Sequence, residues 1–349
     1  MTTSTAPAPA RRLPARAAHR IPAVDIARGL AVLTMFVAHA QPTVATGALD
    51  VLLVAGGGER PRTLFAVVGG IALGLFVASA ERRGLSAREI RRDIAVRGVA
   101  LIALGLVLQT MASGVAVVLD TWGLLFLIAL PFLRVRTPLL LGGAAVAVVA
   151  GSALAAALPI AARDELARHQ VLNQLFEWLA IGQYPLLLWI GFLALGFAIS
   201  RFTLGRRSTQ LLLLGTGAVL ALATLATRGA GGAGERPFPT ELLVHLAAIG
   251  AAVALIAALL VATDPARGWR RVTGAVLWPV QAVGAMPLTV YTVHVVALAV
   301  WRSSGGALAD TWLPFAVLTA ASLVGASLWA ATLGQGPLER VLAALSRAR

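Results

Sequence analysis

The feature that most constrains this chain is a series of long apolar segments separated by short segments rich in arginine. The segment Thr137–Leu158 contains no charged residue, and several others extend beyond the roughly 18 apolar residues that mark a membrane-spanning helix. Hydrophobic residues make up 58% of the 349 residues, and no polar segment is long enough to form a separate soluble domain. The sequence therefore predicts an all-α fold, a polytopic bundle of helices integral to a membrane.

The apolar segments predict about ten transmembrane helices within a membrane domain that covers residues 21–335. These segments are Ile21–Ala40, Arg62–Ala80, Ile94–Ala112, Gly114–Leu133, Thr137–Leu158, Leu179–Ser200, Gln210–Thr227, Glu241–Ala262, Val283–Trp301 and Thr311–Leu333. Residues 1–20 have no apolar period, and we expect a disordered basic cytoplasmic tail there. The segments Thr43–Gly58 and Val272–Ala282 are expected at the membrane interface, and residues 336–349 as a short basic helix on the cytoplasmic surface.

The arginines predict how the bundle is oriented. All 29 basic residues are arginine. If the N-terminus is cytoplasmic, 21 of them fall in cytoplasmic segments and seven in outer segments, while Arg28 lies within the first helix. This bias is what the positive-inside rule predicts, and it places both termini in the cytoplasm of a multi-pass protein of the cell (plasma) membrane. It also accounts for most of the net charge of +14 without a nucleic-acid partner.

The N-terminus offers a second interpretation, a cleavable signal peptide. The pair Arg11-Arg12, the apolar run that follows and the small residues on either side of His39 resemble such a signal and its cleavage site. Asp25 and Arg28 shorten the apolar run, however, so we expect the first helix to be retained.

The first predicted helix carries charged and titratable residues where a membrane helix is normally apolar. Eleven residues separate Arg28 from His39, so both lie on one stripe, roughly 16 Å apart along the axis, and Asp25 shares that stripe. His39 is either a general base that takes a proton from an acceptor hydroxyl or amine, or a helix-end histidine bonded to a neighbour. Arg28 either pairs with Asp25 or faces the interior and holds a thioester carbonyl or a phosphate.

The ninth predicted helix is the second one with polar residues in an apolar sequence. Thr289, Tyr291 and His294 lie within the run PLTVYTVHVV, and Tyr291 and His294, three residues apart, share a face. They either line a polar cavity or join helices through hydrogen bonds. Asp120, near the outer end of the fourth helix, is either interfacial or a substrate contact.

The loop between the second and third helices is strongly basic. Arg82, Arg83, Arg91 and Arg92 have the charge to hold the phosphates of a cytosolic donor such as coenzyme A, although the positive-inside pattern also accounts for them. The chain has no cysteine, which excludes disulfides, thiolate nucleophiles and cysteine-ligated zinc. No metal site and no bound cofactor are predicted.

Asp25, Arg28-Gly29 and His39 resemble a motif shared by membrane acyltransferases, in which an Arg-Gly near the cytoplasmic end is followed by a His or Asn eleven residues after the arginine. Acyltransferase family three has a similar Arg and His on its first helix and ten core helices. The heparan-α-glucosaminide N-acetyltransferase-like family has a similar Asp-x-x-Arg-Gly start. The chain also resembles the YeiB-type family of actinobacterial membrane proteins, through Leu64–Leu75, Trp122–Leu133, Gly182–Gly196, Pro239–Gly250, Met286–Leu298 and Gly336–Leu342.

The resemblance implies transfer of an acyl group, with acetyl as the first expectation, from cytosolic acyl-CoA as co-substrate. The implied acceptor is a small molecule, a glycan or a lipid on the outer side of the membrane. In this scheme Arg28 positions the donor thioester and His39 deprotonates the acceptor.

The remaining site residues have supporting roles in the same scheme. Tyr291 or His294 stabilises charge or orients the acceptor, while Asp25, Thr289 and Asp120 are expected to contact substrate. The human-type heparan-α-glucosaminide N-acetyltransferases are understood to use a luminal histidine in the loop after the first helix. This chain has no histidine between His39 and His169, so that role passes to His39.

Two other functions fit the same residues. A proton-coupled transporter or a lipid-binding membrane protein would use the intramembrane Arg, His and Asp as a substrate site. A scaffold without catalysis would respond to Arg28→Ala and His39→Ala only in its stability. The sequence shows no clear internal repeat, which disfavours the repeat-built transporter folds.

Overall fold

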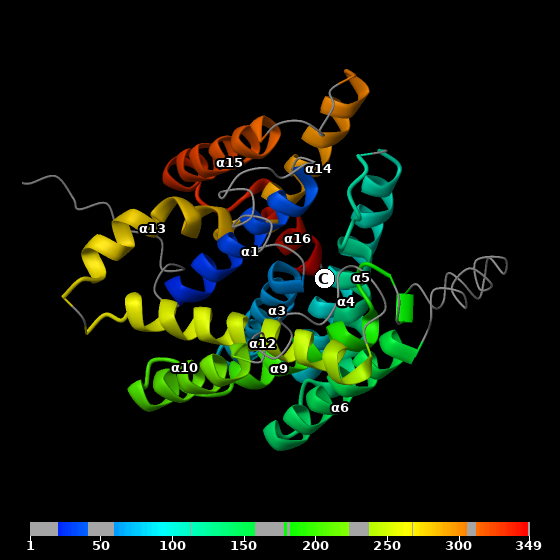
Figure 1. Cartoon of the computed structure of the whole chain (residues 1–349). Coiled ribbons are helices and arrows are strands. Elements are labelled where there is room, and N and C mark those ends of the chain that lie inside the picture. Colours follow the sequence, from blue (N-terminus) through cyan, green and yellow to red (C-terminus); the bar gives the residue numbers. More distant parts are fainter. Residues whose placement is uncertain are drawn as a thin grey trace, which may run out of the picture.

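The computed structural model describes residues 20–40, 59–111, 113–157, 178–179, 182–222, 237–266, 268–305 and 312–347. Within these ranges the protein is all-α and contains no strand (Figure 1). The helices are α1 (Pro22–Ala40), α3 (Glu59–Arg82), α4 (Ala87–Gln109), α5 (Leu119–Ala129) with the 3₁₀ turn η2 (Leu130–Phe132), α6 (Thr137–Ala157), α9 (Leu186–Ile199), α10 (Arg207–Ala221), α12 (Phe238–Ala262), α13 (Arg270–Ala285), α14 (Pro287–Ser303), α15 (Leu313–Thr332) and α16 (Pro337–Arg347). The predicted tail before Arg20 and the segment Thr43–Gly58 lie outside the described residues.

Every predicted transmembrane segment contains a helix, but the helices of the fourth and sixth segments begin several residues later than expected. The fourth was predicted from Gly114, yet α5 begins at Leu119, because Gly114 has a φ of +64°, outside the right-handed helical region. The sixth was predicted from Leu179, yet α9 begins only after Pro185. A proline disfavours helical backbone in the residue before it, which explains why Tyr184 is not part of the helix.

Among the described residues, fewer than ten helices are long and apolar enough to cross a membrane, so the predicted number of ten stays a prediction. Five helices among the described residues, α1, α3, α6, α12 and α15, are long and apolar enough to cross a membrane, and the bent pair α13–α14 makes a sixth. Helix α9, with 14 residues, is about 21 Å long, shorter than the hydrocarbon core of about 30 Å. The charged residues Arg92, Asp93 and Arg97 occupy the first half of α4. The sequence pattern thus overstated the length of the shorter helices.

The segment Val272–Ala282, predicted to lie at the membrane interface, belongs in the structure to a longer helix that is partly packed into the bundle. Helix α13 continues to Ala285, the chain bends by 77° around Met286, and α14 starts at Pro287. Two glycines let α13 approach α1 closely: a Cβ on Gly284 would lie 1.7 Å from the carbonyl oxygen of Asp25, and one on Gly29 would lie 2.1 Å from that of Val280. The second half of α13 is therefore packed into the bundle rather than laid on its surface.

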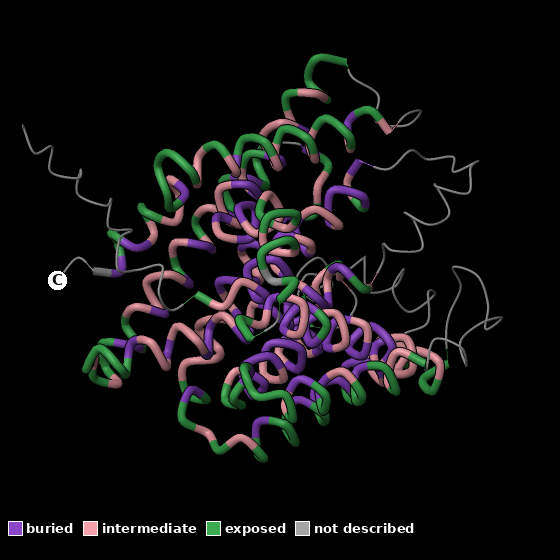
Figure 2. The backbone as a smooth tube through the Cα atoms, turned by 90° about the vertical axis from the view of Figure 1, so that its left-hand side faces the viewer, coloured by how far each residue is buried: buried purple, intermediate pink, exposed green. Residues whose placement is uncertain are grey.

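The buried core lies where α1, α3, α9 and α12 meet. Ile26, Ile71, Phe192 and Ile256 are all at most 1% exposed and belong to one apolar cluster. Figure 2 shows buried stretches concentrated in the middle of the bundle, with exposed residues along its outer helices. The exposed residues of the outer helices include many large apolar side chains, such as Val219 on α10 and Leu328 on α15, as expected for helices that face lipid.

Candidate functional site

Helix α1 carries polar side chains at both of its ends, and each end meets a different part of the bent pair α13–α14. Asp25 and Arg28 lie near its start, and His39 lies near its end. The helical rise separates Arg28 from His39 by about 16 Å. Two distinct polar centres therefore share one helix.

At the first centre, Arg28 is held by two neighbours. Its Nη1 atom donates to Oδ1 of Asp25 at 3.2 Å and to the carbonyl oxygen of Gly284 at 2.9 Å. Asp25 is 5% exposed, and Arg20 approaches its second oxygen at 3.9 Å. The ion pair expected from the spacing of Asp25 and Arg28 is present, and Arg28 in addition satisfies a carbonyl at the C-terminal end of α13.

The N-terminal end of α14 is satisfied by a carboxylate from the other end of the chain. Oε1 of Glu339, on α16, accepts from the backbone N–H groups of Leu288 at 2.8 Å and Thr289 at 3.1 Å. Its Oε2 accepts from the hydroxyl of Thr289 at 2.5 Å. Thr289 is thus part of the joint between α14 and α16, and its predicted role as a substrate contact stays a prediction.

At the second centre, two histidines from different helices come together. Nδ1 of His39 lies 3.1 Å from Nε2 of His294, and the two rings are nearly parallel, with centroids 5.3 Å apart. His294 is 1% exposed, and Phe36 and Tyr291 each lie 4.9 Å from it, ring to ring. Only one proton fits between the two nitrogens, so one ring donates and the other accepts. The pair can therefore hold or release a proton inside the bundle.

Tyr291 links the histidine pair to the start of α5. Its hydroxyl oxygen accepts from the backbone N–H of Val118 at 3.0 Å, and the side chain is 2% exposed. Within the described residues the phenol hydrogen has no acceptor, so the hydroxyl remains able to donate. Asp120 follows in the first turn of α5, where a carboxylate is favoured by the helix dipole, and its Oδ1 is buried without a hydrogen-bond partner in the described part of the chain.

A network at the beginning of α9 borders this second centre. The hydroxyl of Tyr184 donates to the carbonyl of Ala116 at 2.7 Å, and Arg62 donates to the carbonyl of Gln183 at 2.9 Å. Tyr184 and Arg62 were not predicted as site residues. The sequence feature that could have indicated Tyr184 is its position directly before Pro185, at a break between apolar segments.

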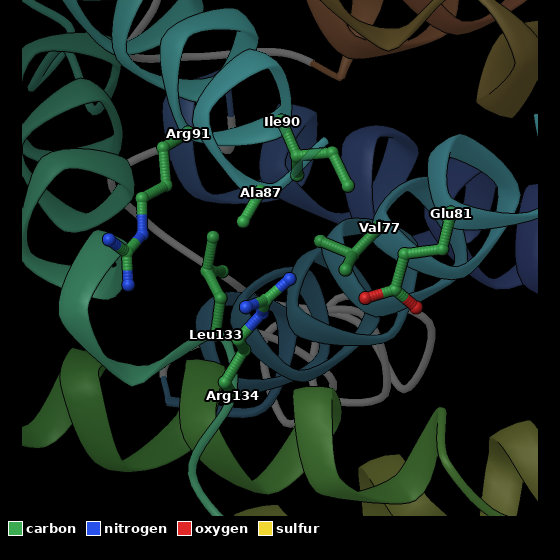
Figure 3. A pocket seen from close by; sticks show the side chains of 7 residues that line it. All are labelled: Val77, Glu81, Ala87, Ile90, Arg91, Leu133 and Arg134. Atoms are coloured by element: carbon green, nitrogen blue, oxygen red, sulfur yellow. The ribbon is translucent and has the colours of Figure 1, made fainter. Parts of the chain in front are cut away.

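The arginines predicted to bind coenzyme A lie on either side of the turn between α3 and α4: Arg82 ends α3, Arg83 follows it, and Arg91 and Arg92 lie near the beginning of α4. Arg82, Arg83, Arg91 and Arg92 are all exposed. Arg91 lines a small pocket together with Glu81 and, from the turn after η2, Arg134 (Figure 3).

A further buried histidine belongs to neither centre. Nδ1 of His245, on α12, lies 3.0 Å from Oγ of Ser152 on α6, and its Nε2 lies 3.9 Å from Glu241. Ser152 also donates to the carbonyl of Val148 and is fully buried, so this contact joins two helices. Among the described residues, no three His, Cys, Asp or Glu side chains gather closely enough to hold a metal ion.

The fold and these contacts define the class: an all-α integral membrane protein in which two helices bring a pair of histidines together inside the bundle. The model of the family described as heparan-alpha-glucosaminide N-acetyltransferase, catalytic, matches residues 20–230, more than half of the chain. The chain therefore belongs to this family, which points to a membrane enzyme of the N-acetyltransferase type. No curated protein matches the chain.

The matched range contains one half of the second centre. It includes Asp25, Arg28 and His39, but it ends before Tyr291 and His294. The similarities to acyltransferase family three and to the YeiB-type family stay predictions.

Proposed function

We propose that this protein is a ten-helix acyltransferase of the cell membrane with both termini in the cytoplasm. It moves an acyl group, acetyl in the first instance, from cytosolic acyl-CoA to an acceptor that is extracytoplasmic or lipid-linked. The arginine bias supports the orientation, and family membership supports the type of reaction. The single observation that carries the proposal is the contact of 3.1 Å between His39 and His294.

The histidine pair supplies the base. As the acceptor nitrogen or oxygen attacks the thioester carbonyl carbon, its proton moves to Nε2 of His39, which carries a free lone pair when Nδ1 of His39 donates to Nε2 of His294. The carbon–sulfur bond then breaks, coenzyme A leaves as the thiolate, and that thiolate takes up the proton. The hydroxyl of Tyr291, which still has a hydrogen to donate, stabilises the negative charge on the carbonyl oxygen. Asp120, one of whose oxygens has no hydrogen-bond partner among the described residues, orients the acceptor.

The distance along α1 changes the role that the sequence assigned to Arg28. A thioester held at Arg28 lies about 16 Å along the axis from His39, too far for direct proton transfer. In our proposal the thioester lies beside the histidine pair, and Arg28 contacts a polar group of the donor nearer the cytoplasm. Arg82, Arg83, Arg91 and Arg92 attract the phosphates of the donor.

The test uses purified protein in liposomes with radiolabelled acetyl-CoA on one side and candidate amine or hydroxyl acceptors on the other. We expect His39→Ala and His294→Ala each to lower the transfer rate by at least 100-fold, within the range of about 10²–10⁴ for general base catalysis. Arg28→Ala is expected to raise KM for acetyl-CoA more than it lowers kcat.

His245→Ala is the matched control, because it removes another buried, hydrogen-bonded imidazole. Equal losses in all three histidine variants would attribute the effect to folding and contradict the proposal. Normal transfer by His39→Ala would contradict it directly.

A second function, a proton-coupled transporter, is favoured by one observation. The pair α13–α14 is a helix broken by 77°, and its backbone ends bind charged side chains, as in the discontinuous helices of transporters. Substrate-dependent proton uptake by liposomes without any transfer of acetyl would support this function.

A further inference from the structure

An apolar cavity of about 310 Å³ opens between α3, α5, α6 and α9. Leu73 on α3, Leu125 on α5, Leu140 on α6 and Phe197 on α9 are among the residues that line it. Every lining residue is apolar, and glycine at position 143 leaves one wall without a side chain. The cavity is thus a gap within a packed region rather than part of either polar centre.

Neither water nor a polar ligand suits this cavity. A buried water molecule needs two to four polar partners, and the side chains here provide none. The inner wall is buried, with Leu125 fully buried and Leu140 6% exposed, while Phe132 and Leu139 on its rim are 50% and 67% exposed. The cavity therefore opens sideways from the bundle, toward the hydrocarbon of the membrane.

Exposed positive charge lies at one end of the cavity. The turn after η2 contributes Leu133 and Val135 to the lining, and the alternate residues Arg134 and Arg136 are exposed. Neither arginine forms an ion pair within the described part of the chain. Arg201 holds the turn in place, because its guanidinium donates to the carbonyls of Leu133, at 2.9 Å, and Val135. Guanidinium groups in such a position bind phosphate through paired charge-assisted hydrogen bonds.

The length of the cavity fits one leaflet of a membrane. Leu125 and Leu133 lie about 12 Å apart along α5 and η2, close to half of the hydrocarbon core of about 30 Å. In the proposed orientation the turn with Arg134 and Arg136 is cytoplasmic, at the level of the lipid phosphates of the inner leaflet.

We propose that this cavity is a binding site for one acyl chain of an anionic phospholipid, whose phosphate is bound by Arg134 and Arg136. The proposal concerns a site apart from the histidine pair and does not depend on the acyltransferase activity. It uses the proposed orientation only to assign the leaflet.

The structure offers a matched pair of variants for the apolar part. Gly142 and Gly143 are neighbours on α6, and a Cβ at either position would meet no atom within 4 Å. Only Gly143 lines the cavity. Gly143→Leu adds a side chain at the wall of the cavity, with open space around its Cβ, and Gly142→Leu adds the same side chain at a position that does not line the cavity.

The experiment measures lipid retention by native mass spectrometry of the full chain released from nanodiscs. The nanodiscs contain equal amounts of dioleoyl phosphatidylglycerol and dioleoyl phosphatidylcholine. We expect the wild type and Gly142→Leu to retain one phosphatidylglycerol, and Gly143→Leu to retain about tenfold less. Retention by Gly143→Leu equal to that of Gly142→Leu would overturn the site.

A double variant tests the charged part. Arg134→Gln with Arg136→Gln should abolish the preference for phosphatidylglycerol over phosphatidylcholine. Arg206→Gln with Arg207→Gln, which removes two exposed arginines near the start of α10, should leave the preference unchanged. An equal loss in both double variants would show a general effect of surface charge and would overturn the assignment of the phosphate to Arg134 and Arg136.

Discussion

Gly284 and Gly274 lie on the same helix, α13, but in opposite surroundings. An added Cβ at Gly284 would lie 1.7 Å from the carbonyl oxygen of Asp25 and 2.6 Å from the backbone nitrogen of Gly29, whereas one at Gly274 would meet nothing within 4 Å. The obstacles at Gly284 are backbone atoms, which no change of rotamer can move. Gly284→Ala must therefore push α13 away from α1 and stretch the hydrogen bond of 2.9 Å from Arg28 to the carbonyl of Gly284.

The two substitutions should have opposite effects on stability. Replacing a glycine by alanine inside a helix stabilises it by about 1 kcal/mol, and this is the whole effect expected at Gly274. At Gly284 the overpacking costs about 3 kcal/mol, at the upper end of the usual range because backbone must move. The net free energy of unfolding should thus fall by about 2 kcal/mol for Gly284→Ala and rise by about 1 kcal/mol for Gly274→Ala.

Thermal unfolding in detergent, followed by tryptophan fluorescence, measures this difference. A gap of about 3 kcal/mol corresponds to a separation in Tm of roughly 4 °C, because the entropy of unfolding is about 2.1 cal/mol/K per residue and the chain has 349 residues. Gly274→Ala should melt above the wild type and Gly284→Ala below it. Two variants that melt together, or in the reverse order, would refute the close packing of α13 on α1.

Three further substitutions test single contacts by the same thermal measurement. Tyr291→Phe removes the acceptor of the buried N–H of Val118 and should destabilise the protein by about 1–3 kcal/mol. Tyr184→Phe removes a hydroxyl at a partly exposed site and should cost less. Equal effects of the two substitutions would contradict the contact to Val118. Glu339→Gln removes the negative charge that binds the start of α14 and should lower the free energy of unfolding by about 1–2 kcal/mol. Glu89→Gln, in the exposed capping box of α4, is the control and should lower it by less. Arg201→Met should cost about 1 kcal/mol, because the carbonyls of Leu133 and Val135 lose a charged donor but stay close to water; no change would show that the turn holds its shape without Arg201.

The helices could be predicted from the sequence because each is a local property. Apolar runs predict the bounds of α6 to within one residue and those of α12 to within three, since a lipid-facing helix needs apolar side chains over its length. The shared stripe of Arg28 and His39 also follows from helical periodicity alone. The start of α9 could have been placed better, because Pro185 restricts the residue before it.

The site depends on contacts between distant parts of the chain, and the sequence pattern holds little information about these. His39 and His294 were each identified as candidates, but nothing in their own segments indicates that their rings meet at 3.1 Å. Glu339 was not singled out as a site residue, although it is an acidic side chain in a basic C-terminal segment. The roles of the Gly284 carbonyl and the Val118 N–H could not be predicted, because any residue provides the same backbone groups.

The bend between α13 and α14 is possible inside a membrane only because its free backbone groups find partners. A break in a helix leaves carbonyls without donors on one side and N–H groups without acceptors on the other, and hydrocarbon satisfies neither. Here a cation, Arg28, binds the C-terminal end of α13, and an anion, Glu339, binds the N-terminal end of α14. Each charge also matches the sign that the helix dipole favours at that end.

It follows that two motifs from opposite ends of the sequence together fix the bend between α13 and α14. The Arg-Gly of α1 provides the cation and, through Gly29, the close approach of α13, while the segment around Glu339 fixes α14. Because His294 lies on α14 and His39 on α1, the geometry of the bend determines whether the two imidazoles meet. A residue of either motif therefore affects the histidine pair even where it touches no substrate. For this reason, loss of activity in an Arg28 variant demonstrates a contact with the acyl donor only when the stability of the protein is unchanged.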